Sequence, residues 1–128
     1  MNYTTNVGER GLAVEETARL IASDKVEGTA VYDRNGASLG RVHCLMIDKI
    51  SGQVAYVVAS FGGFLGIGES LLPLPWKALA YDTRLGGYVV DTDRNRLERA
   101  PRYMPSELPD WSDRAYTEEI DRYWIPPL

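Results

Sequence analysis

The sequence has only one cysteine, Cys44, and only one histidine, His43. A single cysteine cannot form an intramolecular disulfide, and it excludes a metal cage built from cysteines. Positive charge is also scarce, because 14 Lys and Arg stand against 18 Asp and Glu and give a formal net charge of −4. Phosphate binding depends on clustered positive charge, so we expect no nucleic-acid partner and favour a protein or a small molecule.

Long uninterrupted apolar runs are missing as well. Residues 54–76 carry a single charge, Glu69, over a length that could cross a bilayer, but glycines and prolines from residue 62 to 75 divide them into short runs. We therefore predict no transmembrane segment. Residues 1–18 lack the apolar core of a signal peptide, which leads us to expect a cytoplasmic protein.

The composition fits one folded domain. Hydrophobic residues make up 45% of the 128 residues and charged residues 25%, which is ordinary for a globular chain of this size. We predict a mobile N-terminal arm over residues 1–19, a β-rich domain over residues 20–99, and a proline-rich linker with a C-terminal helix over residues 100–128.

Within residues 20–99, short β-branched runs alternate with turns of glycine, asparagine and proline. This pattern predicts six strands, at residues 29–32, 38–50, 53–60, 70–74, 80–82 and 88–90. It also predicts one helical turn before Gly28 with a Ser or Asp cap, a turn of helix at 75–79, and a short helix at 91–99 capped by Thr92 or Asp93. The predicted class is therefore mainly β with short helices.

Three strands carry features that bear on the architecture. The strand at residues 38–50 contains Gly40, which favours a bend that lets one strand serve two sides of a barrel. Strict alternation places Val42, Cys44 and Met46 on one face of it and Arg41, His43, Leu45 and Ile47 on the other. Residues 53–60 are apolar on both faces and predict a doubly buried central strand. Pro73 and Pro75 confine the strand at 70–74 to an edge or a bend.

The ordered segments Val31–Gly36, Leu39–Val42, Ser60–Glu69 and Leu72–Trp76 resemble the PRC-barrel domain family. This family includes the cytoplasmic barrel of the photosynthetic reaction centre H subunit and a domain of a ribosome maturation factor. The resemblance covers residues 20–99 and implies a small, strongly bent β-barrel of about six strands. It also implies docking onto other proteins, a relation to H-chain-like proteins, and no catalytic residue.

Two differences from these relatives limit what the resemblance implies. The reaction-centre relative has a membrane-spanning helix ahead of its barrel, and residues 1–19 are too short and too charged to form one. The ribosome-factor relative has a separate RNA-associated domain, for which this chain leaves no room. We therefore expect a barrel that stands alone with its own helical tail.

Pairs of reactive side chains have simpler structural interpretations. His43 and Cys44 are neighbours on a predicted strand, so their side chains point to opposite faces and cannot form a catalytic dyad. Asp91 and Asp93 could share a face and hold a cation, but aspartates at the positive end of a short helix are the more economical explanation. We predict no catalytic, metal-binding or cofactor-binding residue.

Two local motifs suggest anion binding and are also better explained otherwise. The glycine-rich residues 61–69 lack the Lys and the Ser or Thr of a phosphate-binding loop and lead into a strand instead of a helix. Arg94, Arg96, Arg99 and Arg102 form a local positive cluster. Arg96 and Arg99 would lie one helical turn apart and could share an anion, although simple solvation is the favoured reading.

Apolar side chains in the glycine-rich segment and in the C-terminal helix form the candidate interaction surface. It consists of Phe61, Phe64, Leu65, Ile67, Trp111, Tyr116, Ile120, Tyr123 and Trp124. The helix predicted at residues 111–124 is amphipathic and lays its aromatic face on its own barrel or on a second copy of the chain. We expect a non-enzymatic docking module that forms a homodimer. The alternative is a small-ligand carrier that binds at the barrel mouth or between subunits.

Overall fold

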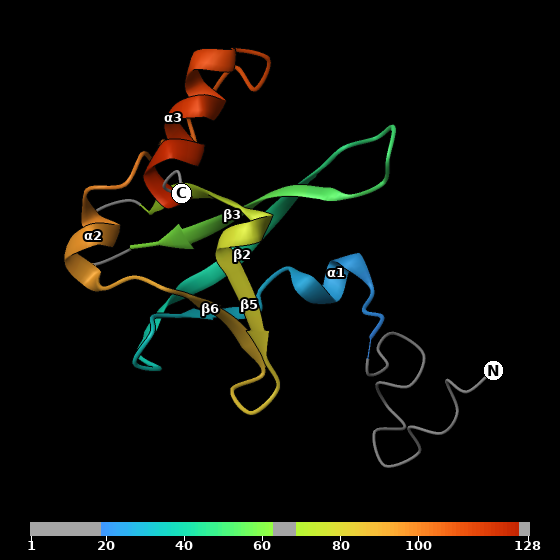
Figure 1. Ribbon diagram of the computed structural model, residues 1–128, viewed down its shortest axis with the longest axis vertical. Helices are drawn as coiled ribbons and strands as arrows, with labels where there is room; N and C mark the ends of the chain where they lie inside the picture. The colour runs from blue at the N-terminus through green and yellow to red at the C-terminus, as the bar shows by residue number, and fades with distance from the viewer. Residues whose placement is uncertain (1–18, 63–68, 126–128) are drawn as a thin grey trace.

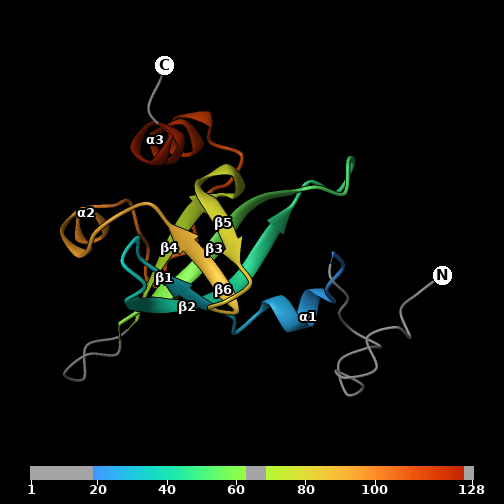
Figure 2. The same cartoon turned by 60° about the horizontal axis from the view of Figure 1, so that its bottom comes forward.

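The computed structural model describes residues 19–62 and 69–125 (Figure 1). One six-stranded sheet contains all the named strands, in the order β4-β3-β2-β1-β6-β5. The strands are β1 (Ala30–Tyr32), β2 (Ser38–Ile47), β3 (Val54–Phe61), β4 (Ser70–Pro75), β5 (Leu79–Asp82) and β6 (Gly87–Val90). Neighbouring strands are antiparallel except β1 and β6, which are parallel. The sheet curls into a half-barrel (Figure 2), which confirms the predicted mainly β class with about six strands.

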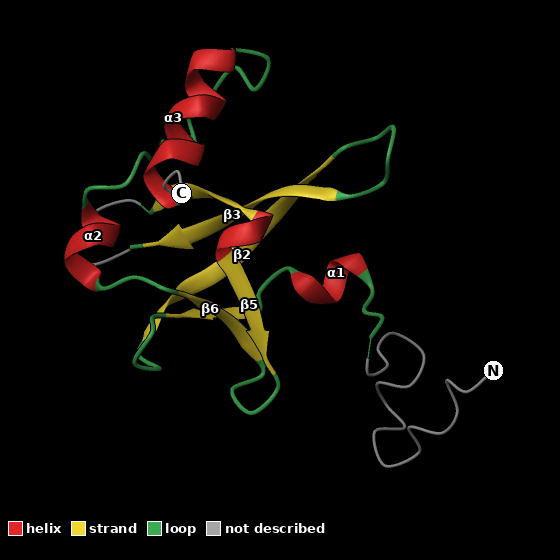
Figure 3. Cartoon of the chain, viewed as in Figure 1, coloured by secondary structure: helices red, strands yellow, loops and turns green. Residues whose placement is uncertain are grey.

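Within residues 19–62 and 69–125, four short helical elements accompany the sheet (Figure 3). They are α1 (Ser23–Val26), the 3₁₀ turn η4 (Trp76–Ala78), α2 (Arg94–Glu98) and α3 (Arg114–Trp124). Asp93 caps α2 by accepting a hydrogen bond from the Arg96 amide, as predicted. The predicted Ser or Asp cap of α1 is wrong, because the capping position is Ala22 and no side chain satisfies the free amides there. No helix within the described ranges has the length and apolar character needed to span a membrane.

The hydrophobic core is concentrated on β3 and β4. Val57, Val58 and Ala59 are completely buried although consecutive residues of a strand face opposite ways, so β3 is covered on both faces as predicted. The core cluster joins side chains from the whole sheet, including Val31, Val42, Val57, Ala59, Leu72, Leu74, Tyr88 and Val90. β4 ends the strand order, which confirms that its two prolines mark an edge strand.

A bulge in β2 overturns the predicted alternation of its side chains. Val42 pairs with Ala59 and Cys44 pairs with Val58, so His43 is an extra residue without a partner in β3. Beyond the bulge the faces are exchanged, and Leu45, paired with the buried Val57, packs against the core. Cys44 therefore lies on the opposite face from Val42, because the extra residue shifts the two-residue period by one.

Gly40 lies where β2 passes the end of β3, at the position predicted to bend. A Cβ atom at Gly40 would stand 2.2 Å from the carbonyl oxygen of Ser60 and 2.6 Å from a ring carbon of Phe61. The first obstacle is backbone and cannot rotate away. Gly36, in the turn between β1 and β2, differs because it has open space around its Cα and a φ of +84°.

We expect Gly40→Ala to lower the free energy of unfolding by about 3 kcal/mol, because overfilling a packed site costs about 1–3 kcal/mol and here a backbone atom must move. Gly36→Ala is the matched control, with a cost of about 1 kcal/mol from its left-handed backbone alone. Urea denaturation of the two variants compares them directly. A loss for Gly40→Ala no larger than that for Gly36→Ala would contradict the steric explanation.

Candidate interaction surface

The aromatic face of α3 packs on the chain's own core. Ile120 is completely buried and Trp124 is 6% exposed, and both belong to the same core cluster as the sheet residues. Trp111, Tyr116 and Tyr123 are partly buried against that cluster. Figures 1 and 2 both show α3 lying over the sheet, where its closest strand is β4. The helix was predicted to pack either on its own barrel or on a second copy of the chain. The structure shows its buried face packed on the barrel of the same chain.

The glycine-rich part of the predicted surface is only partly described. Phe61 is 8% exposed and belongs to the core cluster. Phe64, Leu65 and Ile67 lie outside the described residues. Among the nine predicted side chains, Phe61, Ile120 and Trp124 are therefore used inside the folded chain.

A tyrosine and aspartate contact connects α3 to β3. The Tyr56 hydroxyl donates a hydrogen bond to Asp121 over 3.1 Å, and the Tyr56 ring lies 5.5 Å from that of Trp111. Burial, followed by the nearby Asp121 carboxylate, raises the pKa of Tyr56 to about 12. Burial likewise raises the pKa of Tyr116 to about 12, with smaller contributions from Tyr103 and Glu119. Both phenols are therefore neutral at physiological pH.

Arg96 fastens the end of α3 to α2. Its guanidinium lies over the rings of Tyr123 and Trp124, at 5.1 and 5.2 Å from their centroids, and donates a hydrogen bond to the Tyr123 carbonyl. The Tyr123 hydroxyl donates in return to the Arg96 carbonyl. Arg102 donates to the Leu97 carbonyl over 2.7 Å. Arg96 and Arg102 thus make contacts within the chain. The position of Arg96 is explained by these contacts without an anion shared with Arg99.

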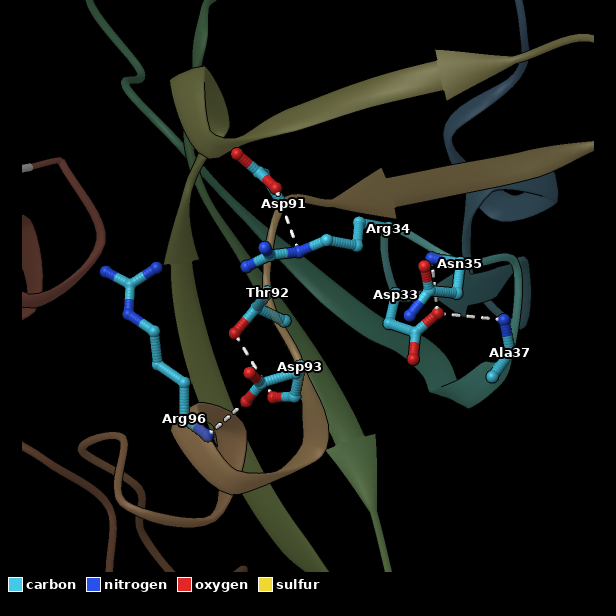
Figure 4. Close-up of polar contacts among 8 residues, drawn as sticks. All are labelled: Asp33, Arg34, Asn35, Ala37, Asp91, Thr92, Asp93 and Arg96. Carbon is cyan, nitrogen blue, oxygen red and sulfur yellow. Dashed lines mark hydrogen bonds and ion pairs between the residues drawn. The ribbon is translucent and has the colours of Figure 1, made fainter.

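The carboxylates that sequence reasoning considered for a cation have structural partners (Figure 4). Asp91 forms an ion pair with Arg34 at 3.2 Å, and Asp93 caps α2. Asp33 accepts hydrogen bonds from the amides of Asn35 and Ala37 and so holds the turn between β1 and β2. Within the described ranges, no three or more His, Cys, Asp or Glu side chains are grouped as metal ligands would be.

His43 and Cys44 lie on β2 as the sequence indicates, next to the bulge. His43 is exposed, whereas Cys44 is partly buried. Burial, with a smaller contribution from Glu27, raises the pKa of the Cys44 thiol and keeps it protonated. A protonated thiol is a poor nucleophile, so these two neighbours provide no reactive pair.

An exposed aromatic group at the other end of the sheet was not predicted from the sequence. Trp76 and Tyr81 are 39% and 45% exposed. Both pack edge-on against the buried ring of Tyr88, with centroid distances of 5.7 and 5.2 Å. We call Trp76, Tyr81 and Tyr88 the β5 aromatic patch. The strands predicted at 80–82 and 88–90 contain Tyr81 and Tyr88, but only the observed register of β5 and β6 sets the two rings directly opposite each other.

The two edge strands of the sheet differ in what covers their free side. Along β4, Leu71 forms two backbone hydrogen bonds of 2.9 Å with Tyr103, and α3 packs against the strand. β4 also contains Pro73 and Pro75, which cannot donate to a further strand. β5, at the other end of the order, pairs only with β6 among the described strands and contains no proline.

A second exposed apolar site lies at the tip of the hairpin between β2 and β3, which projects from the sheet (Figure 1). Ile50 is 93% exposed and Ile47 is 50% exposed. The turn is held by Asp48, whose carboxylate accepts hydrogen bonds from the amides of Ile50 and Ser51. These bonds lower the pKa of Asp48, with that from Ser51 contributing most.

The fold and these contacts define a curled β domain with exposed apolar side chains on one sheet edge and on one hairpin. The PRC-barrel domain family matches residues 19–97, and the chain belongs to this family. A search of curated proteins finds no match.

One similar solved structure is that of a protein from Pseudomonas aeruginosa described as a 16S ribosomal RNA processing protein, RimM. The sequences are 24% identical over 62% of this chain, with a TM-score of 0.37. The match covers 49% of the Pseudomonas protein, so this chain spans about half of its length.

Stability at high pH tests the environment of Tyr56. Because its pKa is raised to about 12, the folded state favours the neutral phenol, and this stabilisation is complete below pH 10 and decreases from there toward pH 12. We expect the free energy of unfolding of Tyr56→Phe to depend less steeply on pH in this range, with Tyr116, Tyr103 and Cys44, whose pKa values are also raised, contributing to the remaining slope. Urea midpoints from pH 8 to 11.5 provide the measurement, with Tyr81→Phe as the control. An unchanged slope in Tyr56→Phe would refute the assignment.

Removing the Arg96 guanidinium, which attaches the end of α3 to α2, should lower the stability of the fold. Arg96→Ala is expected to lower the free energy of unfolding by about 2 kcal/mol, since it removes a charged hydrogen bond and two ring contacts. Arg96→Lys should recover less than half of the loss, because an ammonium lacks the planar donor geometry. The exposed Arg94 on the same helix provides the control, Arg94→Ala, with an expected change of about 0.5 kcal/mol or less. Equal losses at positions 94 and 96 would contradict the contact's importance.

Proposed function

We propose that this chain is a non-catalytic protein-interaction module of the PRC-barrel family and that it associates with itself. The observation that carries the proposal is the β5 aromatic patch, where Trp76 and Tyr81 stay exposed beside an edge strand without a second neighbour in the described structure. Exposed aromatic side chains are enriched at protein interfaces, because they bury large area at a small cost in conformational entropy.

The internal use of the reactive and charged groups also supports this function. Asp91, Asp93 and Arg96 serve ion pairing, capping and helix attachment, and Cys44 holds a protonated thiol. The apolar face of α3 is buried against the sheet of the same chain, so self-association would use a different surface. A cytoplasmic location and a relation to reaction-centre H-chain proteins stay predictions from the sequence.

The alternative function as a small-ligand carrier has one observation in its favour. The Tyr116 hydroxyl and the Trp124 ring nitrogen are buried without a hydrogen-bond partner within the described structure. A polar ligand between α3 and the sheet could satisfy them. Thermal unfolding against a panel of metabolites tests this alternative, and a rise of several degrees with one compound would support it.

Self-association predicts a mass that depends on concentration. We expect sedimentation equilibrium of the full chain, from one to several hundred micromolar, to give an average mass that rises from that of the monomer to that of the dimer. A monomer mass over the whole range would overturn self-association. It would leave the fold and the internal contacts described above unaffected.

A further inference from the structure

We propose that the free edge of β5 pairs antiparallel with β5 of a second copy, so that the two half-barrels share one continuous sheet across a two-fold axis. This inference deepens the proposed self-association and rests on it. It assigns the interface to a particular strand and a particular register.

The first support for this pairing is that the two edge strands, β4 and β5, differ in what covers them. An unpaired strand edge offers a row of amides and carbonyls to other chains, and proteins block such edges with prolines, charges or covering segments. β4 has two prolines and is covered by Tyr103 and α3. β5 contains Leu79, Ala80, Tyr81 and Asp82, with one charge at its last position. Among the described residues, β5 thus has neither the prolines nor the covering segments that protect β4.

The side chains of β5 fit a second copy when Ala80 lies on the two-fold axis. Leu79 and Tyr81 pair with Val90 and Tyr88 and therefore share their face of the sheet, whereas Ala80 lies on the other face, where it is exposed. In this register Leu79 stands opposite the partner's Tyr81, and the two small Ala80 side chains meet at the centre. An aromatic ring opposite an aliphatic side chain is a favourable cross-strand pair.

Charge and symmetry both favour a second copy in this orientation. In this register Asp82, the one charged residue of β5, stands opposite the partner's Ala78, so no like charges meet, whereas an in-register parallel pairing would place the two Asp82 side chains beside each other. A closed dimer with a two-fold axis also requires two identical strands to run in opposite directions. An extended segment of another protein would also satisfy the amides of the edge, but only a second copy repeats the Leu79, Ala80 and Tyr81 pattern with two-fold symmetry.

Charged substitutions at Ala80 test the inference, because its exposed side chain makes no core contact. Ala80→Lys and Ala80→Glu should each weaken dimerisation at least tenfold, since two like charges would meet on the axis. An equimolar mixture of the two variants should recover the dimer as a heterodimer. Ile50→Lys, which adds a charge at the hairpin tip, is the matched control and should dimerise as the unmodified chain does. Sedimentation equilibrium gives the constants, and thermal unfolding shows that each variant is folded.

The outcomes distinguish self-association itself from its assignment to the β5 edge. If the unmodified chain dimerises and the Ala80 variants dimerise equally well, the β5 assignment is overturned while self-association stands. Loss of the dimer in both Ala80 variants without recovery on mixing would also overturn the register. If Ile50→Lys alone abolishes dimerisation, the interface is the hairpin. An unmodified chain that is monomeric throughout overturns self-association itself and with it the β5 interface.

Discussion

A sheet that curls without closing leaves two edge strands, here β4 and β5. The remaining features of this molecule depend on what covers each of them. Two irregularities of β2 accompany the curl: Gly40, where a Cβ atom would collide with the Ser60 carbonyl of β3, and the bulge at His43, beyond which the faces of β2 are exchanged. Further register shifts lie between Val31 and Tyr32 and between Met46 and Ile47, and the six strands surround one core without hydrogen bonds between β4 and β5. The chain connects those edge strands only through the short turn η4.

The C-terminal segment completes the β4 side. Tyr103 adds a short stretch of backbone pairing to β4, and α3 then places Ile120 and Trp124 in the core. Arg96 and Tyr56 hold the two ends of this arrangement by contacts that reach from α2 and β3. The tail is therefore part of the domain's packing, and its removal would expose the core. The β5 side receives no such covering in the described structure, so a partner there would complete what the chain leaves open.

Local signals in the sequence were sufficient for much of the fold. Asp33 and Gly36 specify a turn, Asp93 specifies a helix start, and the apolar run of β3 specifies burial on both faces, because each depends on residues close in sequence. The bulge at His43 was not predictable, since Val42, Cys44 and Met46 fit an unbroken alternation and only the pairing with β3 shows where the period shifts by one residue. The amphipathic pattern of α3 indicated a buried face but not which chain would bury it. The β5 aromatic patch was missed because its exposure depends on what covers the edge of the sheet, which the positions of Trp76, Tyr81 and Tyr88 in the sequence do not reveal.

Amide hydrogen exchange at several protein concentrations tests the central claim most directly, because it reports on the backbone of β5 itself. If β5 pairs with a second copy, the protection of amides in Leu79–Asp82 should increase as the dimer forms, while that of β4 stays constant. Dimerisation with unchanged exchange throughout β5 would show that the open edge is not where this protein meets its partner.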